Sequence, residues 1–154
     1  MTFGVRVCVL VLWMAGIFWF SAQPGHASEV PSDALAEFVQ QLGLPLPTEL
    51  LAFAIRKGAH AFVYFMLGAL TLGVFNPLLR SLRGAAWASV AWVFVYASSD
   101  ELHQLLVPGR SGELRDVALD SVAGALGVLV VLFIYRLKRG STGNEHAAAG
   151  VTVT

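Results

Sequence analysis

Charged residues are scarce in this sequence. Asp, Glu, Lys and Arg make up 13% of its 154 residues, whereas hydrophobic residues make up 56%. A soluble domain usually carries about 25% charged residues. The low charge content therefore argues against a soluble domain and indicates an integral membrane protein of one domain. The formal net charge is zero, which is not the basic balance of a nucleic-acid-binding protein, so we expect no nucleic-acid partner.

Cysteine is nearly absent as well. The single cysteine, Cys8, excludes a disulfide within the chain and excludes a CxxC metal motif. The HExxH motif is also missing. His60, His103 and several carboxylates have side chains of the types that ligate metal ions. No metal-binding motif accompanies them, so we predict no metal site and no cofactor.

Four apolar stretches are long enough to cross a bilayer as helices of about 20 residues. The sequence therefore predicts an all-α membrane protein with a four-helix transmembrane bundle. The predicted spans cover residues 3–20, 50–75, 85–106 and 114–135.

The remaining segments are polar. The Pro-rich stretch between the first two spans contains residues 33–39, whose pattern is typical of a short amphipathic surface helix. The end of the chain is rich in Gly, Ala, Ser and Thr. We therefore predict one membrane domain over residues 1–139 and a disordered tail over residues 140–154.

The distribution of Lys and Arg predicts the orientation, because cytoplasmic loops carry an excess of both. The loop between the first two spans contains neither before Arg56. We therefore expect the N-terminus, the C-terminus and the loop between the second and third spans to be cytoplasmic. A competing interpretation is a signal peptide cleaved after Ala27. The basic residues on the expected cytoplasmic side are Arg6, Arg80, Arg83, Arg136, Lys138 and Arg139.

This topology brings the polar ends of three spans together on the extracytoplasmic side. Ionisable groups at membrane depth are expensive, roughly 2.5–3.5 kcal/mol each at a helix centre, and they usually mark a functional site. Helical spacing of three or four residues places several of them on shared helix faces. The candidate catalytic residues are Asp100, Glu101 and His103. The candidate ligand-binding residues are Lys57, His60, Tyr64, Gln104, Arg110, Asp116 and Asp120.

The fourth span carries one of these residues at depth. At about 1.5 Å per residue, Asp120 lies below the headgroups, so it is either protonated or paired. The predicted cationic partners are Lys57, Arg110 and Arg115. Gly124 and Gly127 continue the same face as a stripe of small residues, which would let another helix approach closely.

Several motifs together resemble the VanZ-like family of small bacterial membrane proteins, which is named after a teicoplanin-resistance accessory protein. The most specific are DELHQ at residues 100–104 and VPGRSG at residues 107–112. They are joined by FWFSAQP at residues 18–24, KGAH at residues 57–60, and Tyr64, Leu67, Gly68, Asp116, Asp120 and Gly124. The chain departs from the pattern at Asp120, where many members carry Asn, so this charge is not expected to be essential to the shared role.

The resemblance implies a four-span protein of the bacterial cell membrane and a link to antibiotic resistance, but no settled reaction. From the residues we expect the outward polar pocket to bind or handle an anionic lipid or a lipid-linked cell-wall precursor. Lys57 and Arg110 would contact phosphate in such a site. Two alternatives stay open: an intramembrane enzyme with His103 or Asp100 as base, and a small transporter or flippase subunit, which would need to form a homo-oligomer.

Overall fold

A computed structural model describes residues 1–149, apart from the side chains of residues 26, 28 and 139–149. Every regular element in the described part is a helix. The helices are α1 (Phe3–Ser21), α2 (Gly25–Gln41), α3 (Thr48–Phe75), α4 (Leu82–Gln104) and α5 (Leu114–Ala149).

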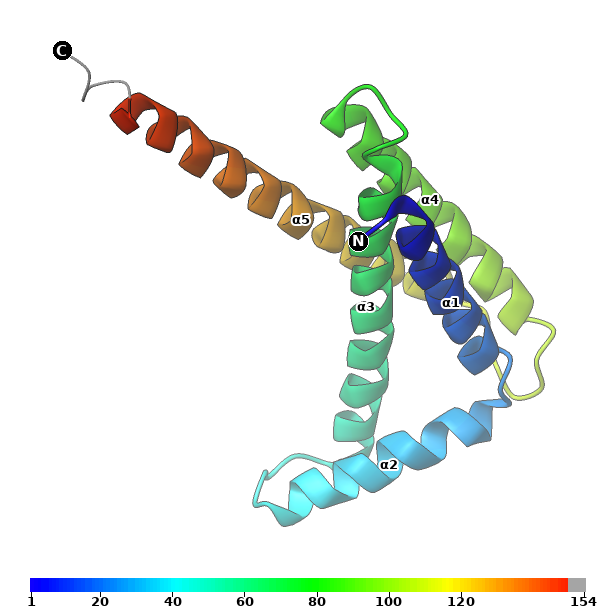
Figure 1. The fold of residues 1–154 in the computed structure, drawn as a ribbon. Coiled ribbons are helices and arrows are strands. Elements are labelled where there is room, and N and C mark those ends of the chain that lie inside the picture. Colours follow the sequence, from blue (N-terminus) through cyan, green and yellow to red (C-terminus); the bar gives the residue numbers. More distant parts are fainter. Residues whose placement is uncertain (150–154) are drawn as a thin grey trace.

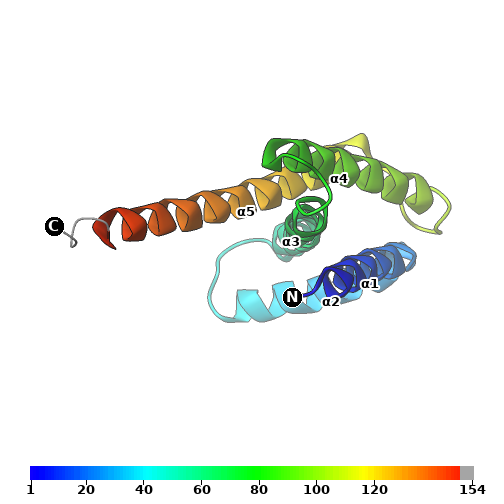
Figure 2. The same ribbon diagram turned by 45° about the horizontal axis from the view of Figure 1, so that its top comes forward.

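Helix α3 is the centre of the arrangement, and each of the other four helices packs against it. Helices α1 and α4 lie along one side of α3, and α2 lies across its N-terminal end (Figure 1). Helix α5 crosses α3 at an angle, and its C-terminal half extends away from the other helices in both views (Figures 1 and 2). The polar ends of α3, α4 and α5 therefore meet near α2.

Three described helices are long and apolar enough to span a membrane: α1, α3 and the Leu114–Lys138 part of α5. The prediction of membrane-spanning helices is confirmed for these three. Helix α4 is not among them, although it coincides closely with the predicted third span. Its sequence mixes Ala, Ser and Tyr with larger apolar residues and ends in two carboxylates, which lowers its hydropathy.

Two segments differ from the sequence-based expectations. Helix α2 is 17 residues long, much longer than the predicted surface helix at residues 33–39. It ends where Gly43 adopts a positive φ of 94°, a common helix terminator. Helix α5 continues through residues 140–149, which we predicted as part of a disordered tail. This stretch contains no proline, and a helix that is already formed gains a hydrogen bond with each residue that extends it. Residues 150–154 lie outside the described residues.

Glycines bring α3 and α5 into backbone contact. A Cβ atom on Gly68 would lie 2.0 Å from the carbonyl oxygen of Gly124, and one on Gly127 would lie 2.0 Å from that of Phe65. No side chain fits at these distances. The stripe predicted from Gly124 and Gly127 is therefore the surface through which α5 approaches α3, as in other membrane helix pairs with small residues at the crossing.

Helix α1 is held to the bundle by side chains that bond to backbone carbonyls. Trp13 Nε1 donates to Val63 O at 2.9 Å, and the Tyr96 hydroxyl donates to Met14 O at 2.6 Å. Near the other end of α1, Arg6 donates to Gly73 O at 3.1 Å. These bonds connect α1 to both α3 and α4 and fix one wall of the cavity described below.

We predict that Gly68→Ala destabilises the protein, because its methyl group would collide with the Gly124 carbonyl. Overpacking of this kind costs about 1–3 kcal/mol. Gly73→Ala is the matched control on α3, since a Cβ there meets nothing within 4 Å. The melting temperatures of both variants in mild detergent test the prediction. Equal melting temperatures would show that the helices do not cross at Gly68.

Candidate functional site

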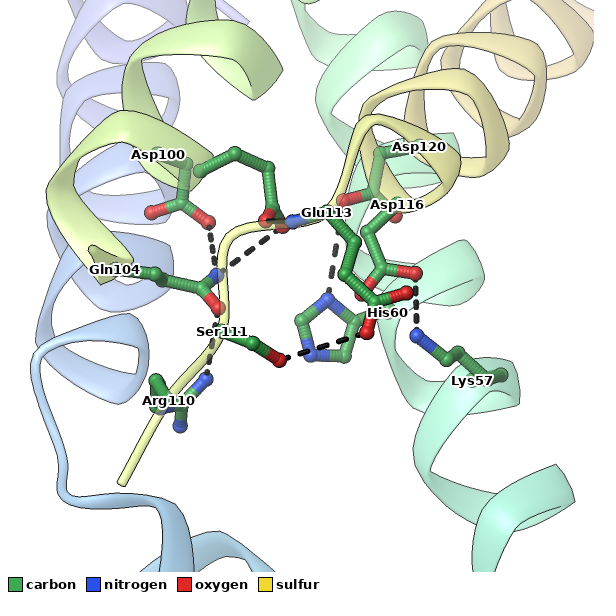
Figure 3. A network of polar contacts seen from close by, with 10 residues as sticks. Lys57, His60, Asp100, Gln104, Arg110, Ser111, Glu113, Asp116 and Asp120 are labelled. Atoms are coloured by element: carbon green, nitrogen blue, oxygen red, sulfur yellow. Dashed lines mark hydrogen bonds and ion pairs between the residues drawn. The ribbon is translucent and has the colours of Figure 1, made fainter. Parts of the chain in front are cut away.

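A Lys–Asp salt bridge and a His–Asp contact join α3 to α5 on the polar side of the glycine crossing. Lys57 Nζ forms a salt bridge with Asp116 Oδ1. One turn further along both helices, His60 Nδ1 lies 3.8 Å from Asp120 Oδ2 (Figure 3). The Asp120 side chain is only 1% exposed, and neither of its oxygens accepts a hydrogen bond. The imidazole of His60 is thus the group that faces this buried carboxylate.

Asp100 on α4 is the centre of a second group of contacts. Its Oδ2 accepts a hydrogen bond from the buried Tyr64 hydroxyl at 3.1 Å and another from Gln104 Nε2 at 3.3 Å. Its Oδ1 is buried and has no hydrogen-bond partner. The Tyr64 hydroxyl of α3 therefore positions the Asp100 carboxylate of α4 by bonding to one of its two oxygens.

Arg110 lies in the loop between α4 and α5, where Gly109 adopts a positive φ of 76°. Its Nε and Nη2 donate to Gln23 O at 2.8 Å and Phe20 O at 3.0 Å, at the C-terminal end of α1. A cation is favourable there because the last carbonyls of a helix lack partners. Arg110 Nη1 also donates to Gln104 Oε1 at 3.5 Å. Burial lowers the pKa of Arg110, but an arginine stays charged at neutral pH.

Two other predicted residues serve the local structure. Glu101 Oε2 accepts from the backbone N–H of Glu113 at 2.9 Å, which connects the start of α5 to α4. His103 stacks on Phe18 of α1 with ring centroids 4.5 Å apart, and its buried Nε2 has no hydrogen-bond partner. Neither Glu101 nor His103 lines the cavity near Asp100.

That cavity lies between α1, α2 and α3 and has a volume of about 700 Å³. Pockets for small ligands usually measure about 300–1,000 Å³. Its walls are mainly apolar, and aromatic side chains of α1 contribute to them, with Trp13, Trp19 and Phe20 among its lining residues. The polar residues that line it include Arg56, His60, Tyr64, Asp100 and Arg110.

A family model named VanZ/LLP1 matches residues 6–135. The chain belongs to this family. The resemblance seen in the motifs is thereby confirmed over most of the chain. No curated protein and no solved structure matches this VanZ/LLP1 protein.

The partners predicted for Asp120 are wrong. We expected Lys57, Arg110 or Arg115, but Asp120 faces His60. The reason is the register of α3 on α5, which pairs Lys57 with Asp116 one turn away. The carbonyls of α1 hold Arg110 instead.

Sequence reasoning also missed the part that α1 and α2 play in this VanZ/LLP1 protein. We singled out residues 18–24 as a motif, but the spacing gave no reason to expect that its carbonyls bind Arg110. Arg56 was not among the predicted site residues, but it lines the cavity, and its Nη1 lies 3.4 Å from Glu29 Oε1 of α2. Ser111 takes no part in the cavity, and its hydroxyl lies 3.5 Å from Glu113.

Within the described residues, no group of three His, Cys, Asp or Glu side chains could hold a metal ion. The chemistry available is that of cations and carboxylates beside an apolar wall. Arg110 can bind an anion, and an imidazole facing a buried carboxylate can hold a proton.

We predict that Lys57 and Asp116 are energetically coupled, because both side chains are less than a third exposed, 28% and 18%. The double-mutant cycle of Lys57→Met and Asp116→Asn should give a coupling energy above about 1 kcal/mol, near the middle of the range for residues in contact. The more exposed pair Arg56–Glu29 is the control, with about 0.2–1 kcal/mol expected. Unfolding in detergent measures both. A coupling energy no larger than that of the control would contradict the register of α3 and α5.

Proposed function

We propose that this protein is a multi-pass protein of the bacterial cell membrane whose cavity binds an anionic lipid or a lipid-linked cell-envelope precursor. The observation that carries the proposal is the composition of the cavity. Its walls are mostly apolar, and cationic side chains lie among its lining residues. A lipid with a phosphate headgroup has matching parts: an apolar chain for the walls and an anionic group for the cations.

Arg110 and the imidazole of His60 are the lining groups best suited to the headgroup. Both line the cavity, and Arg110 uses three of its five N–H groups within the protein. Lys57, which we expected to contact phosphate, does not line the cavity and is paired with Asp116. We therefore assign Lys57 a positioning role between α3 and α5. A part in glycopeptide resistance would follow if the bound molecule were a cell-wall precursor.

We further propose that α4 is the fourth span. Its low hydropathy comes partly from serines, but these hydroxyls bond to carbonyls of the same helix. Ser89 donates to Ala85 O at 2.7 Å and Ser98 to Phe94 O at 2.8 Å. Hydroxyls that are satisfied in this way tolerate a lipid environment. Large apolar side chains such as Trp87 and Val95 are exposed on its surface, where they would face lipid.

Four spans would place both termini in the cytoplasm and the polar cavity outside, with Arg6, Arg80, Arg83 and Arg136 on the cytoplasmic side. We predict that cysteine labelling of a Cys8→Ser background will show this orientation. Ser111→Cys, in the loop before α5, should react with an impermeant maleimide in intact cells. Leu79→Cys, between α3 and α4, should react only after lysis. The reverse pattern would refute the orientation.

We predict that phosphatidylglycerol raises the melting temperature of the protein in mild detergent more than phosphatidylcholine does. A ligand that binds only the folded state stabilises it by about 2.7 kcal/mol at a concentration of 100 Kd. Arg110→Gln should abolish the difference between the two lipids. Arg115→Gln removes the same charge from an exposed residue outside the cavity and should retain it. Loss of the difference in both variants, or in neither, would contradict the assignment of Arg110.

A further inference from the structure

The two oxygens of Asp100 have different surroundings, although both belong to one buried carboxylate. Oδ2 accepts two hydrogen bonds, from Tyr64 and Gln104. Oδ1 is buried and accepts none from the protein. Asp100 is 3% exposed and lines the cavity. A buried acceptor without a donor is costly, and more so when the group is charged. A ligand in the cavity that carries an O–H group would remove this cost.

Arg110 sets a second requirement on the same ligand. Its remaining N–H groups need an acceptor, which an anionic oxygen supplies best. The amide of Gln104 lies between the two residues, since its Oε1 accepts from Arg110 and its Nε2 donates to Asp100 (Figure 3). The acceptor and the donor that the ligand must offer are therefore close neighbours on one headgroup.

We propose that the cavity selects an anionic phosphate headgroup that also carries an O–H group, with the phosphate on Arg110 and the O–H donating to Asp100 Oδ1. The inference rests on the proposed function and narrows its ligand class. Two kinds of lipid supply this chemistry: a phosphodiester with a hydroxylated alcohol, such as phosphatidylglycerol, and a phosphomonoester with a P–O–H, such as phosphatidic acid or a polyprenyl monophosphate.

The experiment compares the affinities of anionic phospholipids with and without an O–H group, by native mass spectrometry of the full chain in mild detergent. Phosphatidylethanol is the decisive probe, because it is an anionic phosphodiester without a hydroxyl group. Phosphatidylglycerol, phosphatidic acid and a polyprenyl monophosphate are the other three probes. We expect at least one of these to bind about three- to tenfold more tightly than phosphatidylethanol, the effect of one hydrogen bond. Which one does so identifies the source of the O–H.

Two variants test whether Asp100 causes the preference for lipids that carry an O–H group. Asp100→Asn should reduce the preference to less than twofold, because an NH₂ group turned toward the ligand cannot accept the O–H. The loss of the negative charge affects all the anionic lipids, so the ratio of their affinities is the readout. Glu113→Gln is the control: Glu113 is an exposed carboxylate that does not line the cavity, and its variant should keep the preference. The lipid comparison on the unaltered protein tests the inference even if Asp100→Asn does not fold.

The outcomes separate the inference from the proposed function. Equal binding of phosphatidylethanol and all three O–H lipids, still dependent on Arg110, would overturn the inference and leave the anionic-lipid function intact. Equal binding is also the result expected if Asp100 is protonated and itself donates to the phosphate, because a hydroxyl group on the lipid would then not increase the affinity. Binding of all anionic lipids no tighter than phosphatidylcholine, with no effect of Arg110→Gln, would overturn both.

Discussion

The close crossing of α3 and α5 is the constraint on which the rest of the structure depends. Gly68, Gly124 and Gly127 allow the two backbones to touch, and this contact fixes the register of one helix on the other. The pairs on the polar side then follow at one-turn intervals, with Lys57 opposite Asp116 and His60 opposite Asp120. In both pairs the partner lies about sixty residues further along the chain, so the two helices run in the same direction. A larger residue at the crossing would separate the charges as well as the helices.

This register decides which polar groups remain for a ligand. The partly buried ion pair of Lys57 and Asp116 adds little net stability, because desolvation offsets its attraction, but it binds two charged groups to each other outside the cavity. Arg110 reaches the cavity from the opposite side, because its loop is bonded to the end of α1. The residues that line the cavity then include Arg110 with unused N–H groups, His60 facing a buried carboxylate, and Asp100, whose buried Oδ1 has no hydrogen-bond partner. Apolar side chains of α1 and α2 form much of its wall.

The sequence predicts the helices well and the partners poorly, for physical reasons. The apolar stretches near residues 3–20, 50–75 and 114–135 specify their helices directly, because period and length are local properties. The same is true of the glycine stripe on α5.

The pairing of His60 with Asp120 depends on how two helices rotate and slide against each other, which cannot be read from the sequence of one span. The bonds from Arg110 to the carbonyls of Phe20 and Gln23 are harder still to predict, because every residue has a backbone carbonyl whatever its side chain. The extent of α2 is underestimated because Pro31 lies inside it, and a proline in a sequence usually marks the end of a helix rather than its interior.

The most direct test of this account is an experimental structure of the protein in nanodiscs that contain phosphatidylglycerol. The account predicts a lipid in the cavity between α1, α2 and α3, with its phosphate within hydrogen-bond distance of Arg110 and an acyl chain against Trp13. A structure that shows a cavity filled by protein side chains, or Arg110 with all its N–H groups bonded to protein, would contradict it.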